Sequence, residues 1–546
     1  MDINLSLIDI VIFAVYVLAV IVLGVYASRQ GIKTKRDYFL AGDKLPWWMI
    51  GGSIVAANIS VHQLVGAMGT SYQRGFVAMT IEWGAILIGL NALLWVFLPY
   101  YLRNGFYTMP EYLQRRFGMV SRSAFAALIL LTYLFVEVSA VLYIGGMVIH
   151  ALLGIPTSVS IWVLAITTGI YTIIGGLRAV IWTEMFQLGV LLAGGIVLSI
   201  LAVAAVGGPS AIWATSDQWH LLLPANDPDF PWTMYLGGVL CISIFYFATN
   251  QFVVQRVLAA KSEWHARMGV VFTSYLKFLT PLIIVIPGIA AVSLFPNLEN
   301  PDDVFPTLVK HLLPTGLIGL VMAGLVAAVM SHISGAVNSC ATIAAMDFYV
   351  PVRNWWRNRK PSLPVSDEDT TEKDDRMTVM FGRVVGVLTI LFGIFWAVVF
   401  IKHSERPIFI YIFNAYGYFT PGIATMFLMG IFWKRTTNLG ALAAGLLTIP
   451  LSLLLDWLPV HFLGWEQPMP FFNRTGIVFW SCIIICALVS FMTKPKEEKE
   501  LEGLIWRPDS LRLPPDAEQP RHWYARPVIW WAIITVLVLA FYVAFP

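Results

Sequence analysis

The chain has 546 residues, of which 58% are hydrophobic and only 12% are charged. Soluble domains carry about 25% charged residues, so this composition excludes a soluble globular protein. The net charge of +3 is too small to indicate nucleic acid as a partner, and the composition predicts the lipid bilayer instead.

Long apolar runs recur along the whole chain. A bilayer core about 30 Å thick needs roughly 20 apolar residues per helix, so we predict an all-α polytopic membrane protein with about fourteen transmembrane helices. The predicted spans lie near 5–27, 46–70, 76–102, 121–150, 158–176, 180–206, 231–255, 268–293, 313–349, 377–401, 408–433, 438–457, 473–493 and 527–545. Because no basic residue precedes the first run and no small-residue cleavage site follows it, 5–27 is interpreted as a retained span rather than a signal peptide.

Lys and Arg residues gather in one set of alternate loops between these spans. The opposite loops hold only Arg74, Lys310, Lys402, Arg406 and Arg474, and the loop 207–230 has no Lys or Arg. Cytoplasmic loops are the ones enriched in these residues. We therefore predict a multi-pass protein of the cell (inner) membrane with the N- and C-termini both on the external side.

Two cytoplasmic segments are unusually polar. The loop 350–376 contains a stretch from residue 360 that combines proline with dense charge, and it is expected to be mobile. The segment 494–526 is rich in proline and charge and is interpreted as a cytoplasmic linker before the last span. No appended soluble domain and no phosphate-binding glycine loop is visible, so nucleotide hydrolysis has no support.

Polar residues interrupt two of the predicted helices near their middle. In 46–70 they are Asn58, Ser60, His62 and Gln63, and in 231–255 they are Ser243, Tyr246, Thr249, Asn250 and Gln251. If the first span is peripheral, the two interrupted helices open two sets of five, although no internal identity is visible. Broken helices at matching positions of two inverted repeats indicate the binding site of a secondary transporter.

The predicted organisation follows from these sets. It comprises a first helix with a basic cytoplasmic loop (1–45), a first five-helix repeat (46–206), an external loop (207–230), a second five-helix repeat (231–435) and C-terminal helices (436–546).

Several ionisable residues lie inside predicted spans, where charges are usually functional. Glu82, Glu137 and Lys277 are the central ones, and Glu184 lies near the cytoplasmic boundary. The alternative is an ion pair that only fixes helix packing, for example Glu82 with Lys277, or Glu184 with Arg178. On 313–349, small and polar residues at three- and four-residue intervals share one face, and of these Ser331 is the candidate cation ligand.

Ordered sequence segments resemble a known family along nearly the whole chain. They are DYFLAGDKLPWW (37–48), AANIS (56–60), EW (82–83), YTMPEYLQRRF (107–117), VLYIGG (141–146), YTIIGGLRAVIWTEMFQ (171–187), NQFVVQRVLAAKS (250–262), LK (276–277), PGIAA (287–291), NSCATIAAMDFY (338–349) and IFWKRTT (431–437). With these segments the chain resembles the solute:sodium symporter family, specifically its sodium/glucose cotransporter branch. The resemblance implies a LeuT-like core of five-plus-five inverted repeats that transports by alternating access, with Na⁺ as the coupling ion and a sugar or polyol as the solute.

The resemblance also implies a sodium site. Its ligands would be the carbonyl oxygens of Ala56, Ile59 and Ala328 and the hydroxyl of Ser331. The next position commonly supplies a second hydroxyl, but here it is His332. Hard cations prefer oxygen ligands, so either the site keeps four oxygens, with or without a water, or the coupling ion is a proton. Glu184 matches an acidic residue on the cytoplasmic ion exit path.

For the solute, the resemblance implies contacts from Gln63, Glu82 and Lys277, with Asn58 shaping the site and Tyr246 stacking below the sugar as an inner gate. This chain departs from the pattern at Ala85, Ser243, Glu137 and Phe413, which replace a serine, two asparagines and a glutamine, and His62 is an additional group. The alternative for His62 is a histidine that faces another helix and touches no ligand. Because these changes alter the available hydrogen bonds, inositol, a deoxy or amino sugar, or a less polar solute remain candidates beside glucose and galactose.

Three alternatives stay open at this point. A symporter of a carboxylate or amino acid would need a cation such as Lys277, although Glu82 and Glu137 oppose an anion. A non-transporting solute sensor would bind without accumulation. A membrane enzyme is the third alternative, but the sequence shows no nucleophile–base pair or metal cluster beside the carboxylates, so we predict no enzymatic activity. The sequence predicts no oligomeric state.

Overall fold

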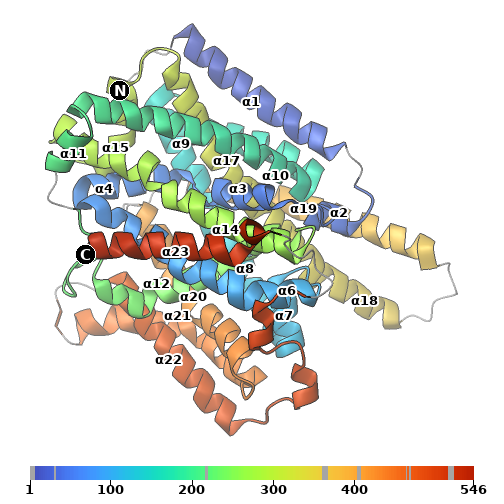
Figure 1. The fold of residues 1–546 in the computed structure, drawn as a ribbon. Helices are drawn as coiled ribbons and strands as arrows, with labels where there is room; N and C mark the ends of the chain where they lie inside the picture. Colours follow the sequence, from blue (N-terminus) through green and yellow to red (C-terminus); the bar gives the residue numbers. More distant parts are fainter. Residues whose placement is uncertain are drawn as a thin grey trace.

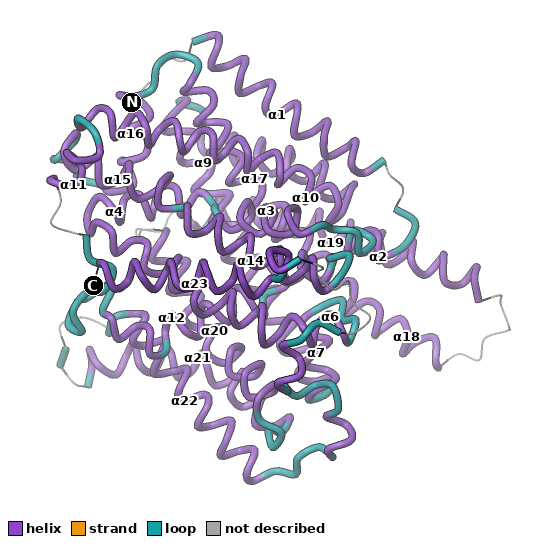
Figure 2. The backbone as a smooth tube through the Cα atoms, in the orientation of Figure 1, coloured by secondary structure: helices purple, strands orange, loops and turns teal. Residues whose placement is uncertain are grey.

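The computed structural model describes residues 6–29, 32–215, 219–359, 367–401, 408–462, 464–465, 469–514 and 522–545. Within these ranges the chain is helical, with only two isolated β-bridges, Leu45–Ala260 and Leu223–Pro231. Figure 2 shows helices joined by short loops throughout the molecule. The all-α prediction is therefore confirmed for the described residues.

The first half of the chain contains helices α1 to α11, several of them interrupted by π- or 3₁₀-helical turns (η). In order they are α1 (Leu7–Ser28), α2 (Lys35–Leu40), α3 (Trp47–Asn58), η1 (Gln63–Ala67), α4 (Met68–Arg74), η2 (Gly75–Met79), α5 (Thr80–Ala85), η3 (Ile86–Leu90), η4 (Leu93–Phe97), α6 (Leu98–Arg103), α7 (Met109–Arg116), α8 (Met119–Thr132), η5 (Tyr133–Val138), α9 (Ser139–Leu153), α10 (Thr157–Val206) and α11 (Pro209–Thr215).

The second half continues in the same way to α23. Its elements are η6 (Trp232–Leu236), α12 (Gly238–Ile244), η7 (Phe245–Thr249), α13 (Gln251–Leu258), α14 (Glu263–Leu279), α15 (Pro281–Leu294), η8 (Pro301–Asp303), α16 (Val304–Leu312), α17 (Leu317–Ile343), η9 (Ala344–Tyr349), α18 (Val350–Arg359), α19 (Asp367–Val399), α20 (Ile408–Phe432), α21 (Asn438–His461), α22 (Phe471–Met492), η11 (Glu498–Leu501), η12 (Pro508–Leu511), η13 (Trp523–Ala525) and α23 (Pro527–Ala544).

By length and composition, 11 of the described helices can cross a membrane, or up to 12 if one bent pair counts as a span. This number is below the expected fourteen, because two of the candidates each cover two predicted spans. Thr157–Val206 comprises two helices that meet at a kink at Gly176, where φ is +58° and ψ is −155°, and these correspond to the predicted spans 158–176 and 180–206. A side chain at Gly176 would collide with the Tyr38 carbonyl, so the kink and the close approach both require glycine. Gln63–Arg103 likewise joins the end of one predicted span to the next.

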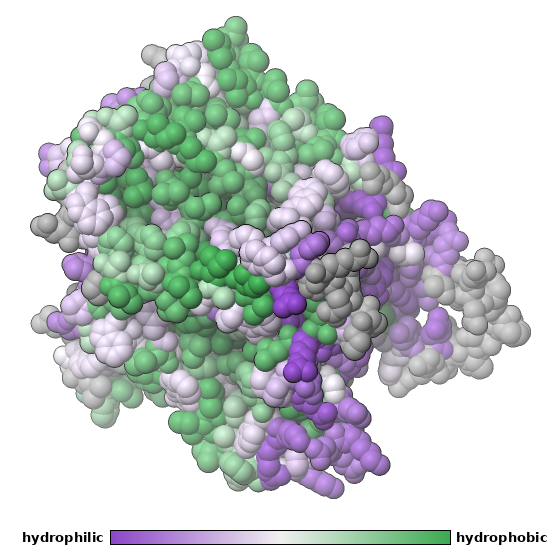
Figure 3. All heavy atoms as spheres, viewed as in Figure 1, coloured by the Kyte–Doolittle hydropathy of each residue, from purple (hydrophilic) through white to green (hydrophobic). Residues whose placement is uncertain are grey.

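Helix α17 forms the centre of the bundle, and 89% of its most apolar stretch is buried. It packs against α10, which also contacts α1, α3 and α15, while α3 packs against α14. Helices α20, α21 and α22 pack together with α12 on the opposite side of the molecule from α1 (Figure 1). The outer faces of α1, α10, α22 and α23 are largely hydrophobic (Figure 3), as expected for surfaces that face lipid.

The first helix is anchored to α17 by one carboxylate. Asp9 is 1% exposed and closes a capping box with Ser6 at the start of α1. Its Oδ1 also accepts hydrogen bonds of 2.8 Å from the backbone N–H groups of Gly316 and Gly319 at the start of α17. One side chain therefore satisfies the orphan amides at the N-termini of two helices.

Helices occupy most of the segment for which we expected a mobile loop. Residues 350–359 form α18 and residues from 367 onward begin α19, while residues 360–366 lie outside the described residues. Part of the charge in this stretch is paired within the described residues. Arg357 lies 3.0 Å from Asp374, and Arg376 lies 2.6 Å from Glu372 one helical turn away. Such pairs support an exposed helix.

The predicted linker 494–526 packs against the helix bundle. Residues 515–521 of this segment lie outside the described residues. The backbone N–H of Trp506 donates to the Ile431 carbonyl over 2.8 Å. The guanidinium of Arg267 donates to the carbonyls of Ser510 and Leu511 over 2.9 and 2.6 Å. Backbone and arginine contacts thus hold the segment against α14 and α20.

The predicted external loop 207–230 contains α11, and residues 216–218 lie outside the described part. Its end is held by Asp227, which accepts from the backbone N–H groups of Phe230 and Asp229 and from the Arg74 guanidinium at the end of α4. Burial acts to raise the pKa of Asp227, but these hydrogen bonds outweigh it and hold the pKa below its ordinary value.

Candidate functional site

The first break in a helix lies where the polar residues predicted it. Helix α3 ends at Asn58, and Ile59 leaves the helical region with ψ of 90°. A helix end leaves its last carbonyls without intrahelical partners. The Ser331 hydroxyl on α17 reaches two carbonyls at this place, donating to Ala56 over 2.8 Å and to Ala328 over 3.2 Å. Three of the predicted sodium ligands thus converge, with the fourth, Ile59, at the break itself.

These oxygen atoms are suitable ligands for the sodium ion that the resemblance implies. Carbonyl and hydroxyl oxygens are hard ligands, and hard cations such as Na⁺ prefer them. In the part of the chain that the structure describes, no group of three His, Cys, Asp or Glu side chains is placed to hold a metal ion. The site between α3 and α17 therefore suits a monovalent cation that takes neutral oxygens.

His332 lies beside this site, but both of its ring nitrogens are engaged elsewhere. Nδ1 is 3.0 Å from the Ala57 carbonyl, and Nε2 is 2.6 Å from Glu137 Oε2. A carbonyl only accepts, so Nδ1 carries a hydrogen, and the contact between Nε2 and the carboxylate needs a second proton. His332 and Glu137 therefore share one proton, and the other oxygen of Glu137 accepts from the Tyr416 hydroxyl. Both carboxylate oxygens of Glu137 are thus occupied by protein groups.

Four of the predicted solute-binding residues form one connected polar cluster. Lys277 on α14 donates to Glu82 on α5 and to the side-chain oxygen of Asn58. The amide nitrogen of Gln63 donates to Glu82 over 2.7 Å, while its carbonyl oxygen is buried without a partner among the described residues. Lys277 is 1% exposed and the Glu82 side chain 15%. The ion pair that we considered as an alternative is present, and Gln63 retains a free acceptor beside it.

The second break lies on the facing helix. Helix η7 ends at Thr249, and Asn250 has extended backbone angles, so that the two halves are bent by 41°. The Asn250 side chain caps α13 through the Phe252 N–H at 3.1 Å and accepts from the Tyr133 hydroxyl. The break is therefore stabilised by its own side chain and by one from η5.

The remaining residues of the predicted solute site surround these clusters unevenly. Tyr246 is half-buried on η7, with its ring centroid 6.5 Å from that of Tyr416 and 6.3 Å from that of Phe252. Ser243 is buried one turn earlier. Phe413 belongs to α20, but its side chain lies outside the described residues.

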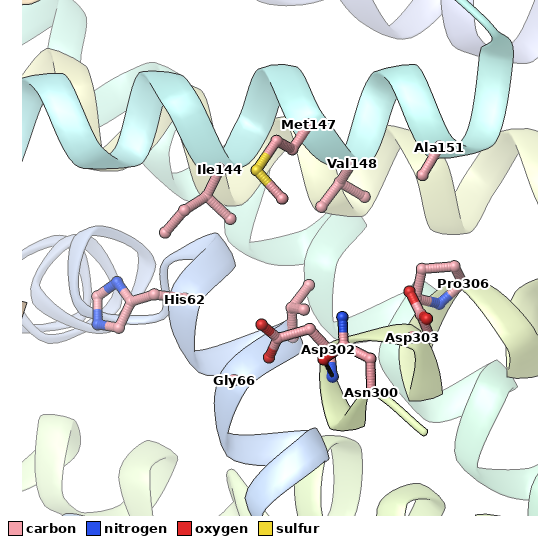
Figure 4. A pocket seen from close by; sticks show the side chains of 11 residues that line it. His62, Gly66, Ile144, Met147, Val148, Ala151, Asn300, Asp302, Asp303 and Pro306 are labelled. Atoms are coloured by element: carbon pink, nitrogen blue, oxygen red, sulfur yellow. Dashed lines mark hydrogen bonds between the residues drawn. The ribbon is translucent and has the colours of Figure 1, made fainter. Parts of the chain in front are cut away.

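His62 occupies a different place from the solute cluster. Its Nδ1 contacts the Ser60 hydroxyl, and its ring centroid is 6.1 Å from that of His332. It lines a cavity of about 100 Å³ between η1 and α9 that also includes Asp302 and Asp303 at the η8 turn (Figure 4). Burial, and secondarily the charge of Asp303, raises the pKa of Asp302 above its ordinary value.

Glu184 is fully buried and pairs with Arg256 on α13 rather than with Arg178. It also accepts from the hydroxyl of Ser53, one turn before Ala56 on α3. Arg256 donates to Ser53 over 2.7 Å and to the Phe252 carbonyl. The pair therefore packs directly against the segment that carries the candidate sodium ligands.

Two residues of this network were not singled out from the sequence. Arg256 lies just beyond the predicted span 231–255, yet it is 1% exposed inside α13. Tyr416, one turn after Phe413, donates to Glu137. The signal for Arg256 was its place at the end of the interrupted segment 250–256, only a few residues from the break. Nothing in the sequence connected Tyr416 to Glu137.

The family profile of the sodium:solute symporters matches residues 38–448. The chain is 32% identical over 531 residues to the sodium/glucose cotransporter of Vibrio parahaemolyticus, covering 91% of this chain and 92% of that protein. It is 32% identical over 551 residues to the sodium/myo-inositol cotransporter 2 of Homo sapiens, covering 91% of this chain and 78% of that protein.

Two solved structures share the fold. A Na⁺-coupled sialic acid symporter in a substrate-bound outward-open state superposes with a TM-score of 0.77 at 23% identity, covering 90% of this chain and 99% of that one. Mhp1, a nucleobase-cation-symport-1 family transporter, gives a TM-score of 0.54 at 14% identity, covering 85% and 97%. These likenesses identify an all-α, LeuT-like membrane fold. Because the profile matches most of the chain and the relatives cover nearly all of it, the chain belongs to the sodium:solute symporter family, which comprises transporters and not enzymes, and it is a sodium-coupled solute symporter.

Proposed function

We propose that this symporter carries a sugar or polyol into the cell, coupled to sodium, by alternating access. The observation that supports the solute class best is the cluster of Gln63, Glu82, Lys277 and Asn58. It offers a cation, a carboxylate and a free amide oxygen at fixed positions. A polyhydroxylated ring can pair with donors and acceptors arranged in this way, and buried groups left unpaired would reject a solute without hydroxyls.

The relatives agree with this solute class. Two of them are named for glucose and for myo-inositol, which are both polyhydroxylated rings. In this chain both carboxylate oxygens of Glu137 are hydrogen-bonded to His332 and Tyr416, so Glu137 has less capacity to accept a hydrogen bond from a solute than an unpaired carboxylate would. We therefore place Gln63, Glu82, Lys277 and Asn58 in contact with the solute, with Tyr246 and Ser243 beside it and Phe413 and His62 at its margin.

Coupling between ion and solute is proposed to pass through the end of α3. A sodium ion held by Ala56, Ile59, Ala328 and Ser331 would tie this end to α17. Asn58 lies two residues after Ala56 and accepts from Lys277 in the solute cluster. An ion that fixes the last turn of α3 therefore also fixes Asn58, so sodium binding would favour the arrangement that binds the solute.

The same proposal includes the conformational cycle and the topology. The two breaks, at Ile59 and Asn250, would lie in the helices that open the repeats 46–206 and 231–435. The Glu184–Arg256 pair would close the cytoplasmic ion exit, while the cavity beside His62 would lie on the entry side. Both termini would then face the outside, as the distribution of Lys and Arg predicts.

Uptake into proteoliposomes tests the proposal directly. The panel comprises radiolabelled glucose, galactose, myo-inositol, amino sugars, proline and lactate, each with an imposed sodium or proton gradient. We expect sodium-driven accumulation of one sugar or polyol, lost in Gln63→Ala and Ser331→Ala. Ser452→Ala is the matched control, because this buried hydroxyl on α21 donates to the carbonyls of Thr448 on α21 and Gly417 on α20, which belong to neither the candidate sodium site nor the solute cluster.

The other outcomes separate the alternatives. Accumulation driven by protons alone would contradict sodium coupling and favour the proton shared by His332 and Glu137 as the coupling ion. Accumulation of proline or lactate would contradict the solute class. Binding without accumulation would contradict transport and favour a sensor.

A further inference from the structure

A deep apolar groove opens on the outer surface of the bundle. It has a volume of about 410 Å³ and lies between η2, α5, α10, α11, α14, α15 and α23, at the end of the molecule that holds the C-terminus (Figure 1). No charged side chain lines it. Half of its lining residues are aromatic, among them Phe76, Trp83, Trp213, Phe278 and Phe541, and the others, such as Leu282, are aliphatic or proline.

The groove opens toward the lipid-facing surface. Its walls include residues of four candidate membrane spans, namely Gln63–Arg103, Thr157–Val206, Glu263–Leu294 and Pro527–Ala544. Two residues of its rim are strongly exposed, Trp213 by 57% and Leu282 by 55%. The surface over α10, α15 and α23 is predominantly hydrophobic (Figure 3). An apolar hollow in such a surface is filled by hydrocarbon more favourably than by water, which would find no hydrogen-bond partners there.

The inner wall of the groove adjoins the solute cluster. The rings of Trp83 and Phe278 are stacked, with centroids 5.1 Å apart and an angle of 14° between their planes. Phe541 packs edge-on against both, at 5.2 and 5.4 Å. Trp83 follows Glu82 in the chain and Phe278 follows Lys277. The three-ring wall is therefore built from the same helical turns that carry the ion pair.

We propose that this groove binds one acyl chain of a bilayer phospholipid, and that the chain supports the Trp83–Phe278 wall behind the Glu82–Lys277 pair. Trp83 is 2% exposed, so the hydrocarbon tail contacts the partly exposed rings of Phe278 and Phe541 in front of it and supplies the dispersion contacts that these two rings lack. Its head group remains at the membrane surface, because the groove offers no charged partner. Occupancy stabilises α5 against α14 and therefore stabilises the folded protein.

Photolabelling in liposomes tests the occupant. The probe is a phosphatidylcholine with a diazirine in the middle of one acyl chain, and adducts are mapped by mass spectrometry. We expect adducts at Phe541, which is half-buried, to exceed those at Val22, which is 58% exposed on α1. Leu282→Trp fills the groove and should reduce the Phe541 adducts at least fivefold. Val536→Trp is the matched control, because Val536 is 65% exposed on α23 but does not line the groove.

A second measurement covers the effect on the fold. Adding phospholipid to the delipidated protein in detergent should raise the thermal unfolding midpoint of the wild type and of Val536→Trp, and should raise that of Leu282→Trp less. The proposal is overturned if Phe541 and Val22 are labelled equally, or if Leu282→Trp leaves the labelling unchanged. Preferential labelling by a probe with the diazirine on its head group, or a polypeptide found crosslinked there, would equally overturn it.

Discussion

Replacing Lys277 by methionine should destabilise the protein more than replacing it together with its partner. Lys277→Met keeps the length and the apolar stem of the side chain but removes the ammonium group. Glu82 is then left as a carboxylate with one remaining hydrogen bond, from Gln63 at 2.7 Å. In Glu82→Gln/Lys277→Met both charges are gone, and only the Asn58 oxygen loses its donor.

The expected magnitudes follow from burial. Removing one partner of a buried pair costs about 3–5 kcal/mol, and we expect about 3 kcal/mol here because 15% of the Glu82 side chain is still exposed. The double variant should lose only about 1 kcal/mol, the value of one unmade hydrogen bond. The coupling energy is the cost of the double variant minus the summed costs of Lys277→Met and Glu82→Gln, so its magnitude is about 2 kcal/mol plus the cost of Glu82→Gln alone, well above the scatter of about 0.5 kcal/mol for independent sites. Both variants should also bind the solute about tenfold or more weakly, because each lacks a charge-assisted hydrogen bond.

The assay uses the four buried cysteines, Cys241, Cys340, Cys482 and Cys486. A thiol-reactive dye labels them only when the bundle opens, so its fluorescence reports unfolding in mixed detergent micelles. Lys434→Met is the control, since it makes the same substitution in the exposed pair with Glu498 and should change the unfolding midpoint little.

One result would refute the reasoning. If the changes in unfolding free energy for Glu82→Gln and Lys277→Met were additive, the two charges would not stabilise each other, although their side chains are in contact. A double variant that keeps full solute affinity would leave the pair as a packing device and remove it from the solute site.

Three further predictions concern other parts of the molecule. Gly335→Ala places a methyl group 2.7 Å from the Arg256 guanidinium and should cost about 1–3 kcal/mol of unfolding free energy, whereas Gly189→Ala meets open space and should cost nothing; equal effects would contradict the packing argument. Tyr416→Phe removes the hydroxyl that donates to Glu137 and should lower the unfolding free energy by about 1–2 kcal/mol. An unchanged unfolding free energy would contradict this hydrogen bond. Asp227→Asn should lower the thermal midpoint at pH 7, because a carboxyl with a lowered pKa in the folded state stabilises above its ordinary pKa of 3.8. That difference should shrink as the pH falls through the folded-state pKa, and a difference that grows on acidification would contradict it.

The sequence predicted the places where helices break better than it predicted what contacts them. Polar residues inside an apolar run located the breaks after Asn58 and at Asn250, because unwound backbone in a membrane must be satisfied by neighbouring polar groups. It also indicated that Glu82 and Lys277 were candidates for a pair, since two opposite charges inside the membrane rarely stay apart.

The partners of other charges were beyond sequence reasoning. Glu137 and His332 lie 195 positions apart on different helices, and only the packing of η5 against α17 brings them together. Glu184 had a nearby basic residue in the sequence, Arg178, but its partner is Arg256, from α13. The position of a charge along the chain limits its depth in the membrane, but it leaves the rotation of each helix undetermined.

The single carboxylate that caps both α1 and α17 has a consequence for the order of events during synthesis. Asp9 leaves the ribosome about 300 residues before Gly316 and Gly319, whose amides it accepts. During that interval α1 carries an acidic group that its own Ser6 satisfies only in part, and a carboxylate near the end of a helix costs less at the membrane surface than in the bilayer core. The first helix is therefore expected to remain shallow or loosely held until α17 has been inserted. Its final packing in the bundle is therefore a late step of biogenesis, although it is synthesised before α17.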